Sequence, residues 1–148
     1  MRLALFTLVL LAVSAVAAAA EPPGPAPEHS SNAPPPAWIS THHAAHWLAY
    51  SSYCWNTGEV NACADMVAPH CSDSSVPKIR VHKRERVRLH LGFTPSEVTV
   101  DVNGRTRELR AVRNPAWRVR RRGVLFVFTR AAAGDASYVA CLRVTRAP

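Results

Sequence analysis

Six arginines in the second half of the chain have the spacing of an anion-binding surface. Guanidinium groups form paired hydrogen bonds with phosphate and carboxylate. Arg118 and Arg120 flank Val119, so both should lie on the same side of an expected strand. Arg105 and Arg107 lie on a second expected strand. The six are Arg105, Arg107, Arg118, Arg120, Arg121 and Arg122. We predict that they form an anion-binding face; the alternative is a solvated face produced by an arginine-rich composition.

Charge is distributed unevenly along the chain. The formal net charge of the 148 residues is +8 at pH 7. Residues 21–75 hold five acids and no lysine or arginine, whereas residues 76–148 hold 17 basic side chains and five acids. This asymmetry favours a basic surface for an anionic partner, or an acidic segment that lies against its own basic domain. Nucleic acid is not the expected partner, because one aromatic residue, Trp117, is too few for base stacking.

A histidine cluster is the second group with ligand chemistry. Ser40 or Thr41 has the chemistry of an N-cap, and a short helix behind it would place His42 and His46, or His43 and His46, on one face. Imidazole pairs at this spacing bind zinc or copper, weakly when no third ligand joins them. The alternative is a solvated, histidine-bearing lead-in to the domain.

Catalytic groups are sparse in this sequence. No serine lies in the glycine context of a nucleophile elbow, and the expected core strands carry valine and leucine instead of carboxylates. Asp135 and Ser137 have the chemistry of a turn, in which their side chains cap the backbone. Other acids of the basic half are expected on turns or outward faces: Glu85, Glu97, Asp101 and Glu108. We therefore expect a non-catalytic protein without a cofactor.

The beginning of the chain predicts export. Residues 1–20 have the pattern of a secretory signal peptide, with one arginine, a short apolar run and then small residues. Residues 21–37 are rich in proline and alanine and are expected to form a flexible linker. Residues 38–148 then make one domain, in which residues 38–49 form a short helix or an irregular lead-in. We expect a secreted or periplasmic protein with no transmembrane segment after the leader.

Alternating apolar residues predict an all-β domain. Period-two patterns of this length are typical of half-buried strands, and Asn103-Gly104 is typical of a tight hairpin turn. The fold that fits best is an antiparallel, immunoglobulin-like β-sandwich of about seven or eight short strands, with a small closed barrel as the alternative. The expected strands cover residues 50–55, 62–67, 78–82, 86–91, 98–102, 105–112, 117–120, 124–129 and 138–144.

Three short motifs carry a family resemblance. Residues 53–55, 63–65 and 134–138 read Tyr-Cys-Trp, Cys-Ala-Asp and Gly-Asp-Ala-Ser-Tyr. Together with the expected strands near residues 79–81 and 86–89, they resemble small exported bacterial proteins with an immunoglobulin-like β-sandwich. These proteins have no assigned biochemical function. The resemblance therefore implies a fold and export, and it implies no activity.

Four cysteines allow three disulfide connectivities, and an oxidising compartment favours disulfides over metal or redox roles. The expected first hairpin places Cys54 opposite Cys63. The resemblance implies that Cys71 and Cys141, which are additions to its pattern, pair with each other. Cys141 is out of phase with the apolar row that contains Leu142, so we expect its side chain to point away from the core and to attach the loop near residue 71 to the last strand.

These observations leave three hypotheses about function. The first is an exported, non-catalytic binding or structural module at the cell envelope or outside the cell, with an unknown protein partner. The second is a protein that binds a polyanion, such as a wall polymer, lipid head groups or extracellular DNA, through the arginine face. The third is weak zinc or copper binding by the histidines. Only the second predicts binding that falls steeply with salt.

Overall fold

The computed structural model describes residues 20–146 of the chain. These residues contain eleven β-strands and no helix. The strands are β1 (Trp38–Ser40), β2 (Ala45–Trp47), β3 (Ala49–Asn56), β4 (Asn61–Ala64), β5 (Lys78–His82), β6 (Arg86–His90), β7 (Glu97–Val102), β8 (Thr106–Leu109), β9 (Ala116–Arg118), β10 (Gly123–Ala131) and β11 (Gly134–Thr145). The all-β class is confirmed. The predicted number of about seven or eight strands is too low, in part because the three-residue strands β1 and β2 are too short to produce a periodic pattern.

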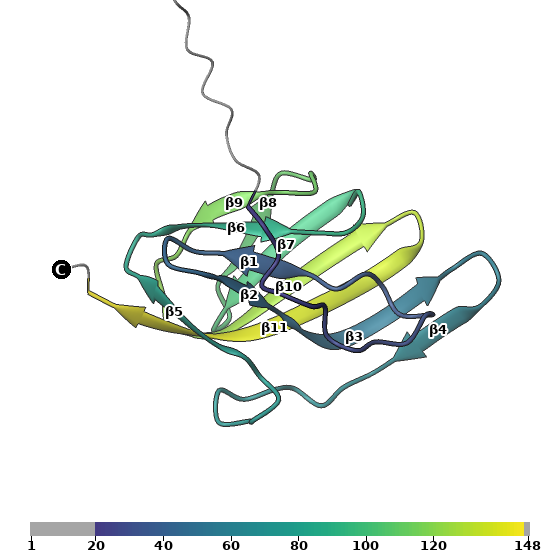
Figure 1. Ribbon diagram of the computed structural model, residues 1–148, viewed down its shortest axis with the longest axis horizontal. Helices are drawn as coiled ribbons and strands as arrows, with labels where there is room; N and C mark the ends of the chain where they lie inside the picture. Colours follow the sequence, from purple (N-terminus) through teal and green to yellow (C-terminus); the bar gives the residue numbers. More distant parts are fainter. Residues whose placement is uncertain (1–19, 147–148) are drawn as a thin grey trace, which may run out of the picture.

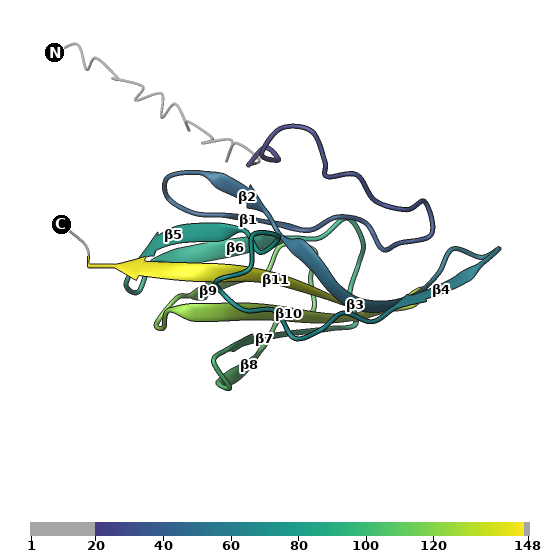
Figure 2. The same cartoon turned by 90° about the horizontal axis from the view of Figure 1, so that it is seen from below.

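The strands form two sheets that face each other (Figure 1). The smaller sheet has the order β2-β1-β6-β9, and the larger has the order β4-β3-β11-β10-β7-β8, with β5 also paired to β11. Pairs between the described strands are antiparallel except β5 with β11, which is parallel. Figure 2 shows the layers from the side, with β1 and β2 on one side of β11 and with β10, β7 and β8 on the other.

Both sheets contribute side chains to one core. Ile39, Leu89 and Trp117 come from the smaller sheet, and Val127 and Tyr138 come from the larger. Every second residue of the longer strands points here, as the period-two pattern predicts. Burying one large apolar side chain contributes about 1.5–3 kcal/mol, so the shared core is what holds the sheets together.

The Asn103-Gly104 hairpin is confirmed. Asn103 has φ 52° and Gly104 has φ 74°, the left-handed conformations that a two-residue turn between antiparallel strands requires. Backbone hydrogen bonds of 3.2 and 3.3 Å between Val102 and Arg105 close the turn. The turn fixes the register of β7 and β8, in which Arg107 lies opposite Val100.

The predicted helix of the lead-in is wrong, because this stretch forms a β-hairpin. Thr41 begins the turn between β1 and β2: its amide and its hydroxyl both donate to the carbonyl of Ala44, at 2.9 Å each. The same hydroxyl accepts from the amides of His43 and Ala44. Thr41 thus caps a turn instead of a helix, and pairing of β1 with β2 outweighs a weak local signal.

The end of the predicted linker packs on the domain. Ala33 and Ala37 are buried, and Tyr138 of β11 donates its hydroxyl to the carbonyl of Pro35 at 2.7 Å. The expectation of a mobile linker is therefore wrong for residues 33–37. Residues 1–19 of the predicted signal peptide lie outside the described residues. Within residues 20–146, no helix has the length and hydropathy needed to cross a membrane.

Both predicted disulfides are present. Cys54 and Cys63 lie opposite each other on β3 and β4, and Cys71 is bonded to Cys141 of β11. Cys141 is on the side of β11 away from the shared core, as expected. It is nevertheless buried, because the loop attached by the disulfide covers it together with Val139.

Candidate functional site

Five of the six predicted arginines converge at one open edge of the two facing sheets. β8 is the last strand of the larger sheet and β9 is the last strand of the smaller sheet. Arg107 lies opposite the buried Val100, so it is on the side of β8 that faces the smaller sheet. A hollow of about 430 Å³, here called the edge cleft, lies between these edges. Its arginines are Arg105, Arg107, Arg118, Arg120 and Arg121.

The floor of the edge cleft is apolar. Val100 and Val102 of β7 line it from the larger sheet, and Trp117 and Val119 line it from the side of β9. Trp117 and Val119 are almost fully buried, so packing in the core fixes the backbone that carries Arg118 between them. The cleft therefore combines exposed cationic side chains on both walls with a well-packed apolar floor.

Among residues 20–146, the arginines of the edge cleft have no carboxylate partner. None of the residues that line the cleft is acidic. Asp101, on the neighbouring strand β7, accepts hydrogen bonds of 2.8 Å from the amide of Gly104 and from the hydroxyl of Thr106. In residues 20–146, both ion pairs that form involve Arg130, on a different face. The guanidinium groups are thus available to an external anion.

A second basic hollow adjoins the edge cleft, and we name it the crossover hollow. It measures about 360 Å³ and shares Arg120 and Arg121 with the cleft. Arg122, the sixth predicted arginine, lines it together with Lys83. The side-chain amide of Asn103 donates to the carbonyl of Arg122 at 3.0 Å and so holds this segment beside the β7–β8 turn.

Lys83 is a site residue that the sequence does not reveal. It lies in the turn from β5 to β6, more than 30 residues before Arg120. Its amide donates to the carbonyl of Thr145 at 2.9 Å, at the end of β11. This proximity arises from the parallel pairing of β5 with β11, which no local periodicity encodes.

The predicted metal ligands do not converge. His42 and His43 lie in the turn before β2, and His46 is on β2 opposite Ile39. His43 instead approaches His82 of β5, with 2.7 Å between the two Nε2 atoms. Within residues 20–146, no three residues of the usual metal-ligating types are grouped for a metal ion. The helix that would have placed His46 on one face with His42 or His43 is absent, because the stretch is a hairpin. Weak metal binding by these histidines stays a prediction.

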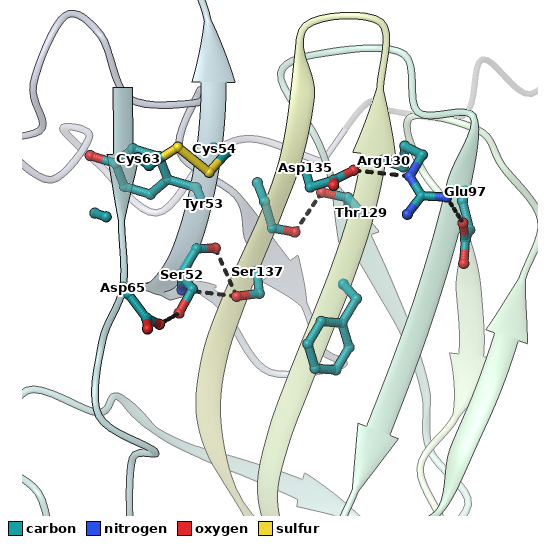
Figure 3. Close-up of a pocket in the computed structure, with 13 residues that line it drawn as sticks. Ser52, Tyr53, Cys54, Cys63, Asp65, Glu97, Thr129, Arg130, Asp135 and Ser137 are labelled. Atoms are coloured by element: carbon teal, nitrogen blue, oxygen red, sulfur yellow. Dashed lines mark hydrogen bonds and ion pairs between the residues drawn. A yellow bond between two sulfur atoms is a disulfide. The ribbon is translucent and has the colours of Figure 1, made fainter. Parts of the chain in front are cut away.

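A larger hollow lies elsewhere, on the outer face of the larger sheet (Figure 3). This outer-face hollow measures about 670 Å³ and is lined by residues of β3, β4, β7, β10 and β11. Arg130 donates to Glu97 at 3.2 Å and to Asp135 at 3.0 Å, and Ser52 donates to Asp65 at 2.8 Å. With three carboxylates against one arginine, the outer-face hollow disfavours anions.

Asp135 and Ser137, which were expected in a turn, lie within β11 and line the outer-face hollow. The Ser137 hydroxyl accepts from the amide of Ser52 and donates to its carbonyl, at 2.9 Å each. These bonds replace the backbone pairs lost at the register shift between Ala136 and Tyr138. Asp135 pairs with Arg130, as Figure 3 shows. Ser137 therefore holds a β-bulge, and no histidine lines the hollow to activate either serine.

Comparisons of the chain with protein-family models, with curated proteins and with solved structures found no match. The assignment of a function therefore depends on the residues that line the edge cleft and the hollows around it.

Proposed function

We propose that this protein is an exported, non-catalytic binding domain whose edge cleft holds an anionic component of the cell envelope or the extracellular space. One observation carries the proposal. Five arginines from the edges of two different sheets meet in one hollow, and no carboxylate lines it. Mutual repulsion between five cations disfavours this arrangement in the free protein, and a bound anion relieves it.

The chemistry of the edge cleft suits phosphate or carboxylate groups that are carried on a carbon skeleton. Guanidinium forks on both walls form charge-assisted hydrogen bonds to such anions. Val102, the partly exposed valine of the floor, contacts an uncharged part of the ligand. A free inorganic anion would use the walls and leave the floor unoccupied. We therefore favour an envelope polymer or lipid head group over a simple ion.

The predicted export agrees with this ligand class. Two disulfides are typical of proteins that fold in an oxidising compartment. Outside the cytoplasm, the abundant anions are wall polymers, acidic polysaccharides and lipid head groups. We also propose that the domain is an immunoglobulin-like β-sandwich, as the sequence predicts. The two sheets that face each other across one core support this part of the proposal.

A second candidate function is protein binding at the outer-face hollow. Phe128 is 47% exposed in its floor, and no segment among residues 20–146 covers it. An exposed aromatic residue inside a hollow is typical of interaction surfaces. The acidic lining of the outer-face hollow would select a basic partner, whereas the edge cleft would select an anion. The charge of the bound molecule therefore distinguishes the two candidate functions.

Retention on the envelope fraction of the source cells across a salt series tests the anion proposal. The variant combines Arg118→Ser, Arg120→Ser, Arg121→Ser and Arg122→Ser. The matched control loses the same net charge at exposed arginines that line neither the edge cleft, the crossover hollow nor the outer-face hollow: Arg80→Ser, Arg110→Ser, Arg113→Ser and Arg143→Ser.

We expect the wild type and the control to be retained at about 50 mM salt and released by about 500 mM, and the variant to be released throughout. Equal retention of variant and control would contradict the edge cleft as the site. Retention that does not change with salt would favour the protein-binding candidate, because uncharged contacts are not screened.

A further inference from the structure

A third basic hollow continues the first two. It measures about 490 Å³ and lies over the turn from β5 to β6 and the start of β6; we name it the turn hollow. Lys83 lines both the turn hollow and the crossover hollow, just as Arg120 and Arg121 line both the crossover hollow and the edge cleft. The cations of the turn hollow are Lys83, Arg84, Arg86 and Arg88. Shared residues therefore connect the three hollows in series.

Hydrogen bonds hold the turn hollow against the strand of the edge cleft. The amide of Arg84 donates to the carbonyl of Val119 at 2.7 Å, and the amide of Val119 donates to the carbonyl of Glu85 at 2.9 Å. The Arg118 guanidinium donates to the carbonyl of Arg84 at 3.2 Å. The basic turn and the basic segment after β9 are thus fixed side by side, although they belong to different connections between the sheets.

The one acid of the series is already engaged. Glu85 accepts from the amide of His82 at 2.6 Å through one oxygen and from the amide of His42 through the other. Its carboxylate therefore holds two backbone segments in place. Ten cationic side chains line the three hollows beside it: Lys83, Arg84, Arg86, Arg88, Arg105, Arg107, Arg118, Arg120, Arg121 and Arg122.

We propose that the ligand is a linear polyanion that lies along the edge cleft, the crossover hollow and the turn hollow in succession. This inference rests on the proposed anion-binding function and names the class of ligand. A single head group or small anion fills one hollow and leaves the others empty. A chain with regularly spaced phosphates or carboxylates engages all three, and each added hollow increases affinity as a linked binding site.

Lys83 lines both the crossover hollow and the turn hollow, so a substitution at this residue tests whether one ligand occupies them together. Its side chain is exposed, and the contact that holds its turn is made by the backbone amide, which a substitution preserves. Lys83→Glu therefore interrupts the series between the crossover hollow and the turn hollow without altering the edge cleft. Arg143→Glu is the matched control, because Arg143 is exposed and lines none of the three hollows.

Binding of tripolyphosphate and of long-chain polyphosphate, measured calorimetrically on the oxidised protein, is the experiment. For the wild type and the control, we expect the long chain to bind on the order of a hundredfold more tightly than tripolyphosphate. For Lys83→Glu, we expect most of this gain to disappear and the affinity for tripolyphosphate to remain within about twofold of the control, because the short anion occupies the edge cleft. Polygalacturonate, measured in parallel, distinguishes a carboxylate polymer from a phosphate polymer.

The outcomes separate this inference from the proposed function. If Lys83→Glu and the control show the same gain with chain length, the three hollows do not act in series and the inference is wrong, while anion binding stands. If tripolyphosphate and the long chain bind equally well to the wild type, the ligand is a compact anion instead of a polymer. If neither polyphosphate nor polygalacturonate binds to the wild type, both the inference and the proposed function fail.

Discussion

The guanidinium of Arg118 donates a hydrogen bond to the main-chain carbonyl of Arg84, 3.2 Å away and 34 residues earlier in the chain. A carbonyl oxygen positions the guanidinium without neutralising it, whereas a carboxylate would remove much of its charge from the surface. Arg118 is therefore ordered and still attractive to anions. The same bond joins the wall of the edge cleft to the turn from β5 to β6.

Arg118→Lys and Arg118→Ser should separate these two roles. Lysine keeps the charge and loses the planar fork, so we expect weaker polyphosphate binding with an unchanged dependence on salt. Serine removes the charge, and the slope of log affinity against log salt should fall by about 1. Calorimetric titration at four salt concentrations measures both effects. An unchanged slope in Arg118→Ser would show that Arg118 does not contact the anion.

Removing the long disulfide should destabilise the protein more than removing the short one. The Cys71–Cys141 bond spans 70 residues and the Cys54–Cys63 bond spans 9. Restriction of the unfolded chain then contributes about 4 kcal/mol for the long loop and about 2.5 kcal/mol for the short loop. Loss of the long bond also releases the loop that covers Val139. We expect the larger loss of unfolding free energy from the double alanine variant at Cys71 and Cys141.

Urea unfolding of the two double variants, each compared with the oxidised wild type, measures this difference. Reduced wild type, in which both bonds are open, provides the reference for their combined effect. A larger loss from the variant without Cys54 and Cys63 would contradict the loop-length argument. It would indicate that the β3–β4 hairpin depends on its disulfide for pairing.

Period-two alternation was sufficient to place the long strands. It predicted β5, β6 and β7 because these strands bury alternate residues against the core and leave the residues between them more exposed. It also located β11, whose outer side is buried as well, under the loop that the Cys71–Cys141 disulfide attaches. The end of β8 could not be placed in the same way: residues 105–112 were expected as one strand, but pairing with β7 ends at Leu109, opposite Val98. Where a strand stops depends on the length of its partner, which is tertiary information.

The arginine face was predictable for a different reason. Arg118, Arg120, Arg121 and Arg122 are close in sequence, so a short extended segment keeps them together in any β fold. Lys83 and its neighbours join them through the pairing of β5 with β11, which sequence alone does not specify. Local spacing therefore found part of the candidate site, and contacts between distant segments supplied the remainder.

Tyr138→Phe should test whether the segment before β1 is part of the folded domain. The hydroxyl of Tyr138 donates to the carbonyl of Pro35 at 2.7 Å, and the tyrosine side chain is fully buried. Phenylalanine preserves the packing and leaves that carbonyl without its donor, at a cost of about 1–3 kcal/mol. We expect the unfolding free energy to fall by this amount and protease cleavage before residue 38 to accelerate.

Tyr53→Phe is the matched control, because Tyr53 is partly buried and makes no hydrogen bond through its hydroxyl to the described residues. Its effect should stay within about 0.5 kcal/mol. Equal stability of Tyr138→Phe and Tyr53→Phe, with unchanged proteolysis, would mean that the segment around Pro35 contributes nothing to the fold.

His90 should make the protein less stable as the pH falls below neutrality. Burial and the nearby charge of Arg88 lower the pKa of His90, and the side chain of Asn114 opposes this shift only in part. The imidazole stacks on Trp38, with 3.6 Å between ring centroids, and its Nε2 atom lies 2.9 Å from the hydroxyl of Ser40. Each of these contacts is available to the neutral ring.

The direction of the effect follows from proton uptake. Because the pKa of His90 is lower in the folded protein than the ordinary value near 6.5, the unfolded chain binds more protons in the interval between them. The stabilising contribution is complete above about pH 6.5 and is lost as the pH falls toward the folded pKa. Burial lowers the pKa of His46 as well, which adds a contribution of the same sign.

Urea unfolding of the wild type and of His90→Gln between about pH 7.5 and about pH 5 measures this contribution. We expect the wild type to lose stability over the interval and His90→Gln to lose less, because glutamine does not take up a proton. His29→Gln is the control, since His29 is exposed and its hydrogen bond is to the nearby carbonyl of Pro27. If His90→Gln and His29→Gln both follow the wild-type profile, the ring on Trp38 is not what couples stability to pH, and the partly buried His46 of β2 becomes the residue to replace.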